Sequence, residues 1–324
     1  MSKVIGIGNA LVDIMTRLES DDFLEQNNLP KGSMQLVNLE ISQKVLNAAH
    51  SLNKSLASGG SAANTIHGLS NLDVMTGFIG KVGTDEFGSF FRKDMEKSNI
   101  KPELFSSTTE TGRAIAFISP DSERTFATYL GAAVELDSSD LQSDMFAGYR
   151  YLHIEGYLVF NEDLVLRAVA IAKEKNMKVS LDLASYNVVE AKLEFLRRLT
   201  AQYVDIVFAN EEEARAFTGK EPHAALDEIA EMCDIAVVKT GASGSLIKQG
   251  NSVFTVDAIK VKPVDTTGAG DLYASGFLYG LCRNLPLEKC GKAGSILAGK
   301  VIEVIGAKMP DESWKEIHQM INNM

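Results

Sequence analysis

Short apolar runs rich in β-branched residues alternate along the chain with longer segments of amphipathic helical spacing. Strands that alternate with helices of this length predict crossover units and a mostly parallel, doubly wound sheet. The predicted strands are Val4–Gly8, Val74–Ile79, Tyr151–Ile154, Lys178–Leu181, Ile206–Phe208 and Ile235–Lys239. The predicted helices are Ala62–Leu72, Asp163–Lys175, Val189–Leu199, Glu211–Thr218 and Ala224–Cys233, followed near the C-terminus by Asp271–Cys282, Leu287–Ile305 and Asp311–Asn322.

Two stretches interrupt this alternation and predict a small β-sheet beside the main domain. The helical period is lost around Ile14–Leu18 and Gly32–Val37, and Arg113–Ser119 with Arg124–Leu130 predicts a hairpin around the turn PDSE. A small sheet of this kind would be a lid over a site, built from two discontinuous segments at about 14–38 and 113–131. No repeat or long linker divides the rest, so we expect one α/β domain over residues 1–324.

Composition and charge exclude several classes of protein. The net charge of -11 argues against nucleic-acid binding, which needs clustered Lys and Arg. The cysteines Cys233, Cys282 and Cys290 have no CxxC spacing, so we expect neither a disulfide framework nor a zinc site. The N-terminus is unlike a signal peptide, and no run of about 18 apolar residues predicts a membrane span. We therefore expect a cytoplasmic protein without a membrane partner.

The segment VDTTGAGD at 264–271 carries the most chemical information. The apolar spacing that follows it is helical, so residues 268–271 should form the first turn of a helix, where free N–H groups bind anions. Gly268 and Gly270 let the backbone approach a phosphate closely. Asp271 would repel an anion, but it has a purpose if it accepts the proton of a hydroxyl that attacks the phosphate. The alternative is an ordinary helix cap.

Two further segments contain residues suited to a polyol. In SGGSAANT at 58–65, Gly59 and Gly60 precede a predicted helix, and Asn64 offers a donor and an acceptor; a flexible loop capped by Ser61 is the alternative. Asn9 and Asp13 follow the first strand, where ligands of open α/β sheets bind. The sequence GIGNA also suggests a dinucleotide site, but the G-x-G-x-x-G fingerprint is incomplete. Walker, HRD, DFG and HExxH motifs are absent.

Together these segments resemble the PfkB, or ribokinase-like, family of carbohydrate and purine-nucleoside kinases. DTTGAGD at 265–271 is similar to the family's C-terminal signature, SGGSAANT at 58–65 to its di-glycine motif, and NEEE at 210–213 to its N-x-x-E motif. The motifs occur in the family's order, and the resemblance covers nearly the whole chain. It implies a three-layer α/β fold with a β-sheet lid, and ATP-dependent phosphorylation of a hydroxyl on a small sugar or nucleoside.

The resemblance also implies roles for individual residues. Asp271 would be the catalytic base, and the amides of Gly268, Ala269 and Gly270 would form an anion hole. The acceptor would lie against Asp13, Asn9, Gly59, Gly60 and Asn64. Asn210 and Glu213 would act on Mg²⁺ and the phosphates through water, with a helix cap as the alternative. ATP would lie along Lys239, Thr240, Gly241 and Gly244, with the adenine against Gly294–Val301. Some members of the family bind a monovalent cation near Asp265 and Thr267.

The identity of the acceptor is less constrained by the sequence. The segment ERTFATYLGA at 123–132 resembles bacterial adenosine-kinase-like proteins, and Phe117, Phe126, Tyr129 and Tyr157 are candidates to stack on a base. Arg113 and Arg124 could bind a phosphorylated acceptor. We therefore favour adenosine or a ribose-type acceptor, with a hexose or sugar-phosphate kinase as the alternative. A nicotinamide dehydrogenase and a non-catalytic nucleotide-binding regulator are the rival classes. Exposed edges of the lid predict a homodimer.

Overall fold

The computed structural model describes residues 3–121 and 123–324, and its main feature is a large, mostly parallel sheet. Neighbouring strands from β12 to β6 run parallel, and two antiparallel strands close the other edge. In spatial order the sheet contains β14 (Ser252–Val256), β13 (Ser245–Gln249), β12 (Ile235–Lys239), β11 (Ile206–Asn210), β10 (Lys178–Asp182), β9 (Tyr151–Glu155), β1 (Lys3–Ile7), β5 (Met75–Gly83) and β6 (Ile100–Ser107).

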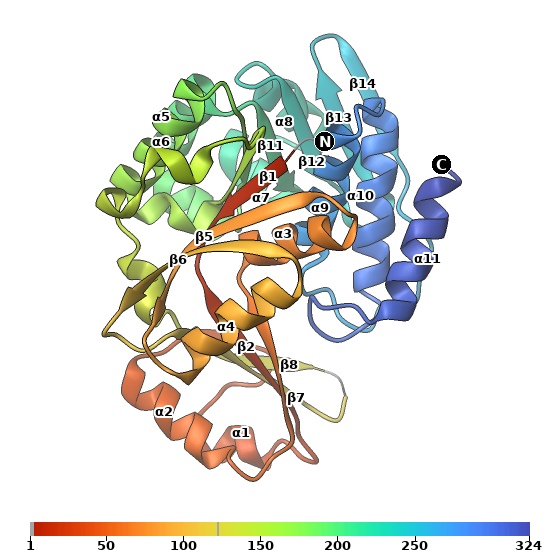
Figure 1. The fold of residues 1–324 in the computed structure, drawn as a ribbon. Coiled ribbons are helices and arrows are strands. Elements are labelled where there is room, and N and C mark those ends of the chain that lie inside the picture. Colours follow the sequence, from red (N-terminus) through yellow and green to blue (C-terminus); the bar gives the residue numbers. More distant parts are fainter. Residues whose placement is uncertain (1–2, 122) are drawn as a thin grey trace.

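A second, smaller sheet lies below the large one in the view of Figure 1. In spatial order it contains β3 (Met34–Leu36), β8 (Arg124–Tyr129), β7 (Gly112–Ile118), β2 (Leu11–Arg17) and β4 (Lys54–Gly59). The predicted hairpin is present, because β7 and β8 are antiparallel neighbours. Residue 122 of its predicted turn lies outside the described residues. β2 follows β1 directly, so one continuous stretch of chain links the two sheets.

Helices cover both faces of the large sheet and give three layers (Figure 1). The alternating side chains of β1 show the division, since Ile5 and Ile7 belong to one buried cluster and Val4 to the other. The first cluster includes α5 (Glu162–Glu174), α6 (Tyr186–Tyr203), α7 (Glu211–Thr218) and α8 (Pro222–Ala230). The second includes α3 (Ser61–Asn71), α4 (Glu86–Lys97), α9 (Ala269–Cys282) and α10 (Leu287–Val301).

The remaining helices complete the two lobes. α11 (Asp311–Asn322) packs on α10 through Trp314 and Ile317. α1 (Asp22–Gln26) and α2 (Leu39–Ala48) cover one face of the small sheet, where Phe23 and Phe117 have ring centroids 4.8 Å apart. Asp13 lies on the opposite face of that sheet, which faces the cavity described below.

Several predicted elements differ from the structure. Strands β4, β6, β13 and β14 and helices α1, α2 and α4 were not predicted. The segments of β4 and β6 contain glycine, proline or polar residues that weaken a strand pattern, whereas α2 and α4 do have amphipathic helical spacing in the sequence. The predicted helix 287–305 ends at Val301. The carbonyl of Ile302 instead accepts hydrogen bonds from the amides of Val264 (2.7 Å) and Asp265 (3.2 Å), which draws the chain out of the helix.

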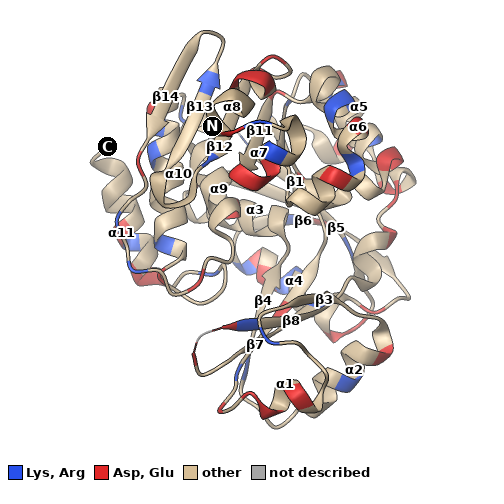
Figure 2. Ribbon diagram, turned by 180° about the vertical axis from the view of Figure 1, so that it is seen from behind, with Lys and Arg blue, Asp and Glu red and all other residues tan. Residues whose placement is uncertain are grey.

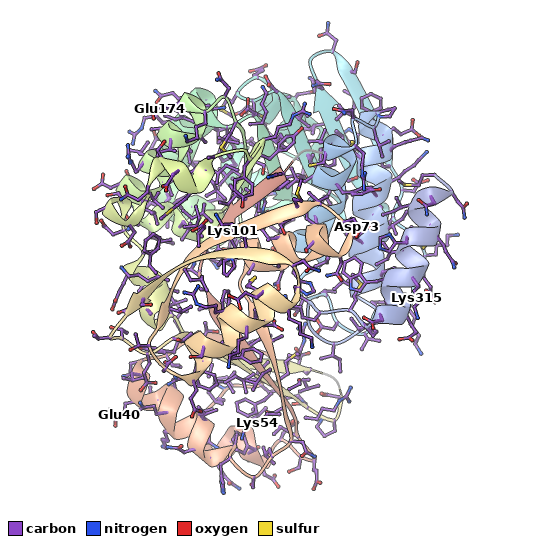
Figure 3. All side chains as sticks on the ribbon, viewed as in Figure 1. Glu40, Lys54, Asp73, Lys101, Glu174 and Lys315 are labelled. Carbon is purple, nitrogen blue, oxygen red and sulfur yellow. The ribbon has the colours of Figure 1, made fainter. Side chains whose placement is uncertain are left out.

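Charged side chains are distributed over the whole surface. Figure 2 shows Lys and Arg interspersed with Asp and Glu on most elements. In Figure 3, Glu40 of α2, Glu174 of α5 and Lys315 of α11 extend outward from the ribbon. None of the helices in the described ranges combines the length and the apolar character that crossing a lipid bilayer requires.

Candidate active site

A cavity of about 1380 Å³ opens where the carboxyl ends of the parallel strands face the small sheet. Ligands of doubly wound sheets bind at this end of the strands. The cavity brings most of the predicted site residues together; those on its wall are Asp13, Gly60, Asn64, Asn210, Glu213, Lys239, Gly241, Gly244, Gly268, Ala269, Gly270 and Asp271. Asn9, Gly59 and Thr240 are not among the lining residues.

Asp271 lies in the first turn of α9 and is held from the neighbouring helix α3. Ser61 Oγ donates to its Oδ1 at 2.7 Å, and Asn64 Nδ2 donates to its Oδ2 at 3.0 Å. Burial raises the pKa of Asp271 to about 6, although the hydrogen bonds from Asn64 and Ser61 oppose the rise. Its side chain does not cap the helix, since the N-cap position belongs to Gly268. The carboxylate is therefore available to a ligand in the cavity.

The turn before Asp271 has the conformation needed for an anion site. Gly268 has φ +76, a left-handed conformation that favours glycine, and the amides of the first helical turn have no carbonyl four residues earlier in the helix. The amide of Ala269 donates to Thr266 O at 3.2 Å. The ammonium of Lys239 lies 3.1 Å from the point where a Cβ of Gly270 would stand. A phosphate here would meet amide dipoles and a positive charge together.

The side chain of Asp265 stabilises this turn by accepting two backbone hydrogen bonds. Its Oδ1 accepts from Thr267 N at 2.6 Å, and its Oδ2 accepts from Gly306 N at 2.7 Å. Arg124 of β8 lies 2.7 Å from the same Oδ1, and it also contacts Thr267 Oγ1. Because a guanidinium already supplies positive charge at Asp265, the residues here do not fit a monovalent cation on this carboxylate. Arg124, which the sequence suggested as a ligand for a phosphorylated acceptor, is thus already paired with Asp265.

The acceptor side of the cavity is formed by β2 and by the turn before α3. The carboxyl group of Asp13 lies 2.3 Å from the point where a Cβ of Gly59 would stand, so any side chain at position 59 would displace this carboxyl group. Gly60 has φ +103 and similarly has no room for a Cβ beside Asn9 O. Burial raises the pKa of Asp13 to about 7, while the charge of Lys308 lowers it. Asp13 and Asn64 thus face the cavity from two different elements.

Asn9 is turned away from the cavity by a buried carboxylate that the sequence did not single out. Glu155, at the end of β9, accepts from Asn9 Nδ2 at 2.6 Å and from Asn9 N at 2.9 Å. Its other oxygen accepts from Ala62 N at 2.9 Å, at the start of α3. Burial raises the pKa of Glu155 to about 7, and these three hydrogen bonds oppose the rise. Glu155 therefore joins the first strand to the helix that holds Asp271.

The other end of the cavity has an acidic pair beside a lysine. Asn210 and Glu213 form a capping box at the start of α7, so the cap predicted as the alternative is present, but Glu213 is buried rather than exposed. Burial raises the pKa of Glu213 to about 7, and Lys239 lowers it. Lys239 Nζ lies 3.0 Å from Asp182 Oδ2. No local motif in the sequence marks Asp182, which follows an ordinary strand.

The donor set fits Mg²⁺ held through water. Both oxygens of Glu213 already accept from Asn210, each at 2.7 Å, and those of Asp182 accept from Ala184 N and from Lys239. Over residues 3–121 and 123–324, no group of three or more His, Cys, Asp or Glu side chains could hold a metal ion. Mg²⁺ commonly keeps several waters and binds through one or two carboxylates together with substrate phosphates.

An apolar wall completes this end of the cavity. It is formed by the loop after β14, by small residues of α10 and by Ile302, and consists of Ala258, Ile259, Val261, Ser295, Ala298, Gly299 and Ile302. That the α10 part of this wall contacts an adenine stays a prediction. The loop residues were not predicted, because they lie in a stretch without secondary structure.

Comparison with known proteins identifies the family. The model of the pfkB family of carbohydrate kinases matches residues 34–314. A 5-dehydro-2-deoxygluconokinase of Bacillus subtilis is 30% identical over 280 residues, which cover 81% of this chain and 86% of that protein. An uncharacterized sugar kinase of Archaeoglobus fulgidus is 29% identical over 243 residues, covering 74% and 96% of the two chains.

Two solved structures resemble the whole chain. A probable sugar kinase from Rhizobium etli has a TM-score of 0.88 and 35% identity, and the match covers 100% of this chain and 99% of the other. An adenosine kinase from Sinorhizobium meliloti has a TM-score of 0.87 and 34% identity, with 98% and 99% covered. The chain belongs to the pfkB family of carbohydrate kinases and is a phosphotransferase that acts on a hydroxyl group of a sugar or nucleoside.

Proposed function

We propose that this protein transfers the γ-phosphoryl group of ATP to a hydroxyl of adenosine or a related ribose-type acceptor, with Asp271 as the base. The observation that carries the proposal is the place of the Asp271 carboxylate. It lies in the same helical turn as the glycine amides, and it is held by Asn64 from the acceptor side of the cavity. A base in that position can take a proton where a phosphate is also bound.

The proposed chemistry divides between two groups of residues. Asp271 accepts the proton of the acceptor hydroxyl as its oxygen attacks the γ-phosphorus, and the bond from that phosphorus to the bridging oxygen of ADP breaks. The amides of Gly268, Ala269 and Gly270, with Lys239 beside them, neutralise the charge that develops on the phosphoryl oxygens. Pre-placed donors of this kind need little reorganisation during the reaction.

We propose that ATP occupies the end of the cavity lined by Lys239, Gly241, Gly244 and the apolar wall. Thr240 contributes to this end through the backbone, since its amide donates to Gly244 O at 2.8 Å and shapes the turn. Asn210 and Glu213 would hold Mg²⁺ through water. The ion would supply charge neutralisation between the phosphates of ATP.

The face of the small sheet supports an acceptor with a flat apolar part. Asp13 pairs across the sheet with Ala114, and Ala116 on the same face pairs with Phe126, which lines the cavity. Tyr157 lines the cavity as well. A carboxylate suited to ribose hydroxyls thus lies near aromatic rings suited to a base. The 34% identity to an adenosine kinase agrees with this assignment.

A sugar or sugar-acid acceptor is the second candidate. It is favoured by the match to a 5-dehydro-2-deoxygluconokinase, which is 30% identical over 280 residues. That acceptor would use Asp13, Gly60 and Asn64 in the same way but would leave the aromatic rings without a partner.

We also propose that the small sheet acts as the lid and that its exposed side chains pair two copies of the chain. Met34 and Leu36 of the edge strand β3 are 64% and 69% exposed. Exposed edge strands with apolar side chains favour pairing with another chain.

The decisive experiment measures ADP release from ATP and Mg²⁺ with a panel of acceptors. The panel contains adenosine, inosine, ribose, fructose, 5-dehydro-2-deoxygluconate and a sugar phosphate. We expect the highest kcat/KM with adenosine. Asp271→Asn should fold and bind ATP but lose at least about 10²-fold in kcat, the lower end of general-base effects. Near-wild-type turnover by this variant would exclude Asp271 as the base. ATP binding without turnover on any acceptor would instead favour a non-catalytic regulator.

A further inference from the structure

Lys308, in the loop between α10 and α11, is a buried cation without a hydrogen-bond partner. Within the part of the chain that the structure describes, its Nζ is covered from solvent and donates to no acceptor. Burial lowers the pKa of Lys308 to about 8, while the nearby carboxylates of Asp94, Asp13 and Asp271 raise it. Burying an ammonium group without a partner costs free energy, so a lysine at this position indicates a functional role that compensates for the cost.

The loop that carries Lys308 is fixed between the small sheet and the turn at residues 265–270, which we call the anion-hole turn after its proposed role. Gly306 N donates to Asp265 Oδ2 at 2.7 Å, and Ala307 Cβ lies 2.7 Å from where a Cβ of Gly268 would stand. The Cβ position of Gly306 lies 2.7 Å from Met15 Sδ. Met15 and Asp13 lie on the same face of β2, because side chains two apart on a strand point the same way. The loop therefore brings Lys308 into the neighbourhood of β2 and Asp13, although Lys308 is not among the residues that line the cavity.

Of the carboxylates near Lys308, two already have donors. Asp94 of α4 accepts from Ser58 N at 2.9 Å and from Ser58 Oγ at 2.6 Å. Asp271 accepts from Ser61 and Asn64. Asp13 of β2 lines the cavity, and the positive charge of Lys308 lowers the pKa of its carboxyl group. His67 of α3 also faces the lysine, and burial together with Lys308 lowers the pKa of this histidine.

We propose that Lys308 is a positioning residue for the acceptor, whose ammonium keeps the Asp13 carboxylate charged so that it can accept hydrogen bonds from two acceptor hydroxyls. This inference rests on the proposed function. Burial alone would favour the neutral acid, which presents one donor and fewer acceptor sites to a pair of hydroxyls. The charge of Lys308 opposes that tendency, and Lys308 is not itself among the residues that line the cavity.

Removal of this charge should shift the pH dependence of acceptor binding. An opposite charge a few ångströms away typically moves a carboxyl pKa by about 1–3 units. Starting from a value of about 7, Asp13 in Lys308→Met would then be mostly protonated at neutral pH. We expect the acceptor KM at pH 7 to rise between about fivefold and several hundredfold, to recover as the pH passes the new Asp13 pKa of about 8–10, and to exceed any change in kcat. Lys308→Arg should stay near wild type.

Two controls separate this role from a structural one. Lys315→Met removes an exposed lysine of α11 and should leave the pH profile of KM unchanged. In an Asp13→Asn background, Lys308→Met should no longer change that profile, because the titrating group is gone. A KM profile that Lys308→Met leaves unmoved, or moves equally in the Asp13→Asn background, overturns the proposal.

A direct titration tests the same inference without turnover. Carbon-13 labelling of aspartate carboxyl groups allows the Asp13 resonance, identified by its absence in Asp13→Asn, to be followed with pH by NMR. Its midpoint should rise by about 1–3 pH units in Lys308→Met, or in Lys308→Gln if the methionine variant does not fold. An unchanged midpoint refutes the role of Lys308. Silence across the acceptor panel would instead refute the proposed function, and the titration would still decide whether Lys308 acts on Asp13.

Discussion

At the scale of single residues, the central feature is a carboxylate under two opposing influences. Burial favours the neutral form of Asp271, and the hydrogen bonds from Ser61 and Asn64 favour the ionised form. The outcome is a pKa of about 6, close to the pH at which a general base works best. The donors on α3 thus set the protonation of the residue on α9.

Ser61→Ala tests this balance. Loss of a hydrogen bond to the ionised form should raise the pKa of Asp271 above about 6. If Asp271 is the base, as proposed, it must be ionised to act, so the acid limb of kcat should move to higher pH, with slower turnover near pH 6 and little change at pH 8. The measurement is kcat from pH 5 to 9 at saturating substrates.

Ser70→Ala is the matched control for this experiment. Ser70 lies on the same helix, but its hydroxyl donates to Ser98 O, away from the cavity. This variant should keep the wild-type limb. If the two variants have the same pH profile, the Ser61 hydrogen bond does not set the ionisation of Asp271.

Some residues of the candidate site could be predicted from the local sequence around them, and others could not. Asp271, Gly268 and Gly60 could be predicted, because a glycine before a helix and an acid in its first turn form a recognisable pattern. Glu155 and Lys308 could not. Each is a charged residue at the end of an ordinary strand or in a loop, and only the fold brings its partners to it.

At the scale of secondary-structure elements, the start of α9 depends on the end of α10. The chain leaves α10 at Val301, and the Ile302 carbonyl and the Gly306 amide then bind the segment that precedes α9. Gly268 packs directly against Ala307 in this arrangement. The conformation of the anion-hole turn therefore depends on residues 302–306, which follow α9 and α10 in the sequence.

Gly268→Ala should consequently impair catalysis more than folding. A left-handed φ costs a non-glycine residue about 1–2 kcal/mol, and the added Cβ would lie 2.7 Å from Ala307 Cβ, so the turn must shift. Misplacement of reacting groups by about 1 Å can cost about 10²-fold in rate, and we expect a loss in kcat of that order. Steady-state kinetics and thermal denaturation measure the two effects.

Gly250→Ala supplies the comparison. Gly250 also has a positive φ, at +54, but nothing lies within 4 Å of its Cβ position, and it belongs to the distant turn between β13 and β14. It should lose similar stability and keep its kcat. Equal kcat losses in both variants would contradict a specific role for the Gly268 turn.

The elements that could be predicted are those with strong local patterns. The β-branched strands at the centre of the sheet were located to within a few residues; β12 matches at both ends. β4, with the sequence KSLASG, has little intrinsic strand preference and becomes a strand because it pairs with β2. Tertiary pairing of this kind leaves no signal in a single sequence.

At the scale of the whole molecule, the site lies between two lobes that touch it from opposite sides. Arg124 of β8 reaches Asp265 in the loop before α9, and among the described residues this is the ion pair that joins the small sheet to that loop. The exposed fractions of the two side chains are 18% and 2%, so solvent screens the pair only in part. The position of the small sheet, the proposed lid, is thereby coupled to the loop that precedes α9.

The outer parts of the small sheet give the prediction about assembly. Leu36 on β3 and Leu56 on β4 are 69% and 45% exposed, and they lie on the two edge strands of the sheet. Exposed apolar side chains at sheet edges favour association. We expect light scattering to give about twice the mass of a 35.2 kDa chain, and Leu36→Glu to restore the monomer. A wild-type protein that stays at 35.2 kDa rejects the dimer.

Val253→Glu distinguishes this interface from a general loss of surface hydrophobicity. Val253 is 51% exposed on β14, the edge strand of the large sheet, and thus resembles Leu36 in exposure and in edge position. If the lid forms the interface, Val253→Glu should remain dimeric while Leu36→Glu dissociates. The reverse result would place the contact on the edge of the large sheet and exclude β3 from the interface.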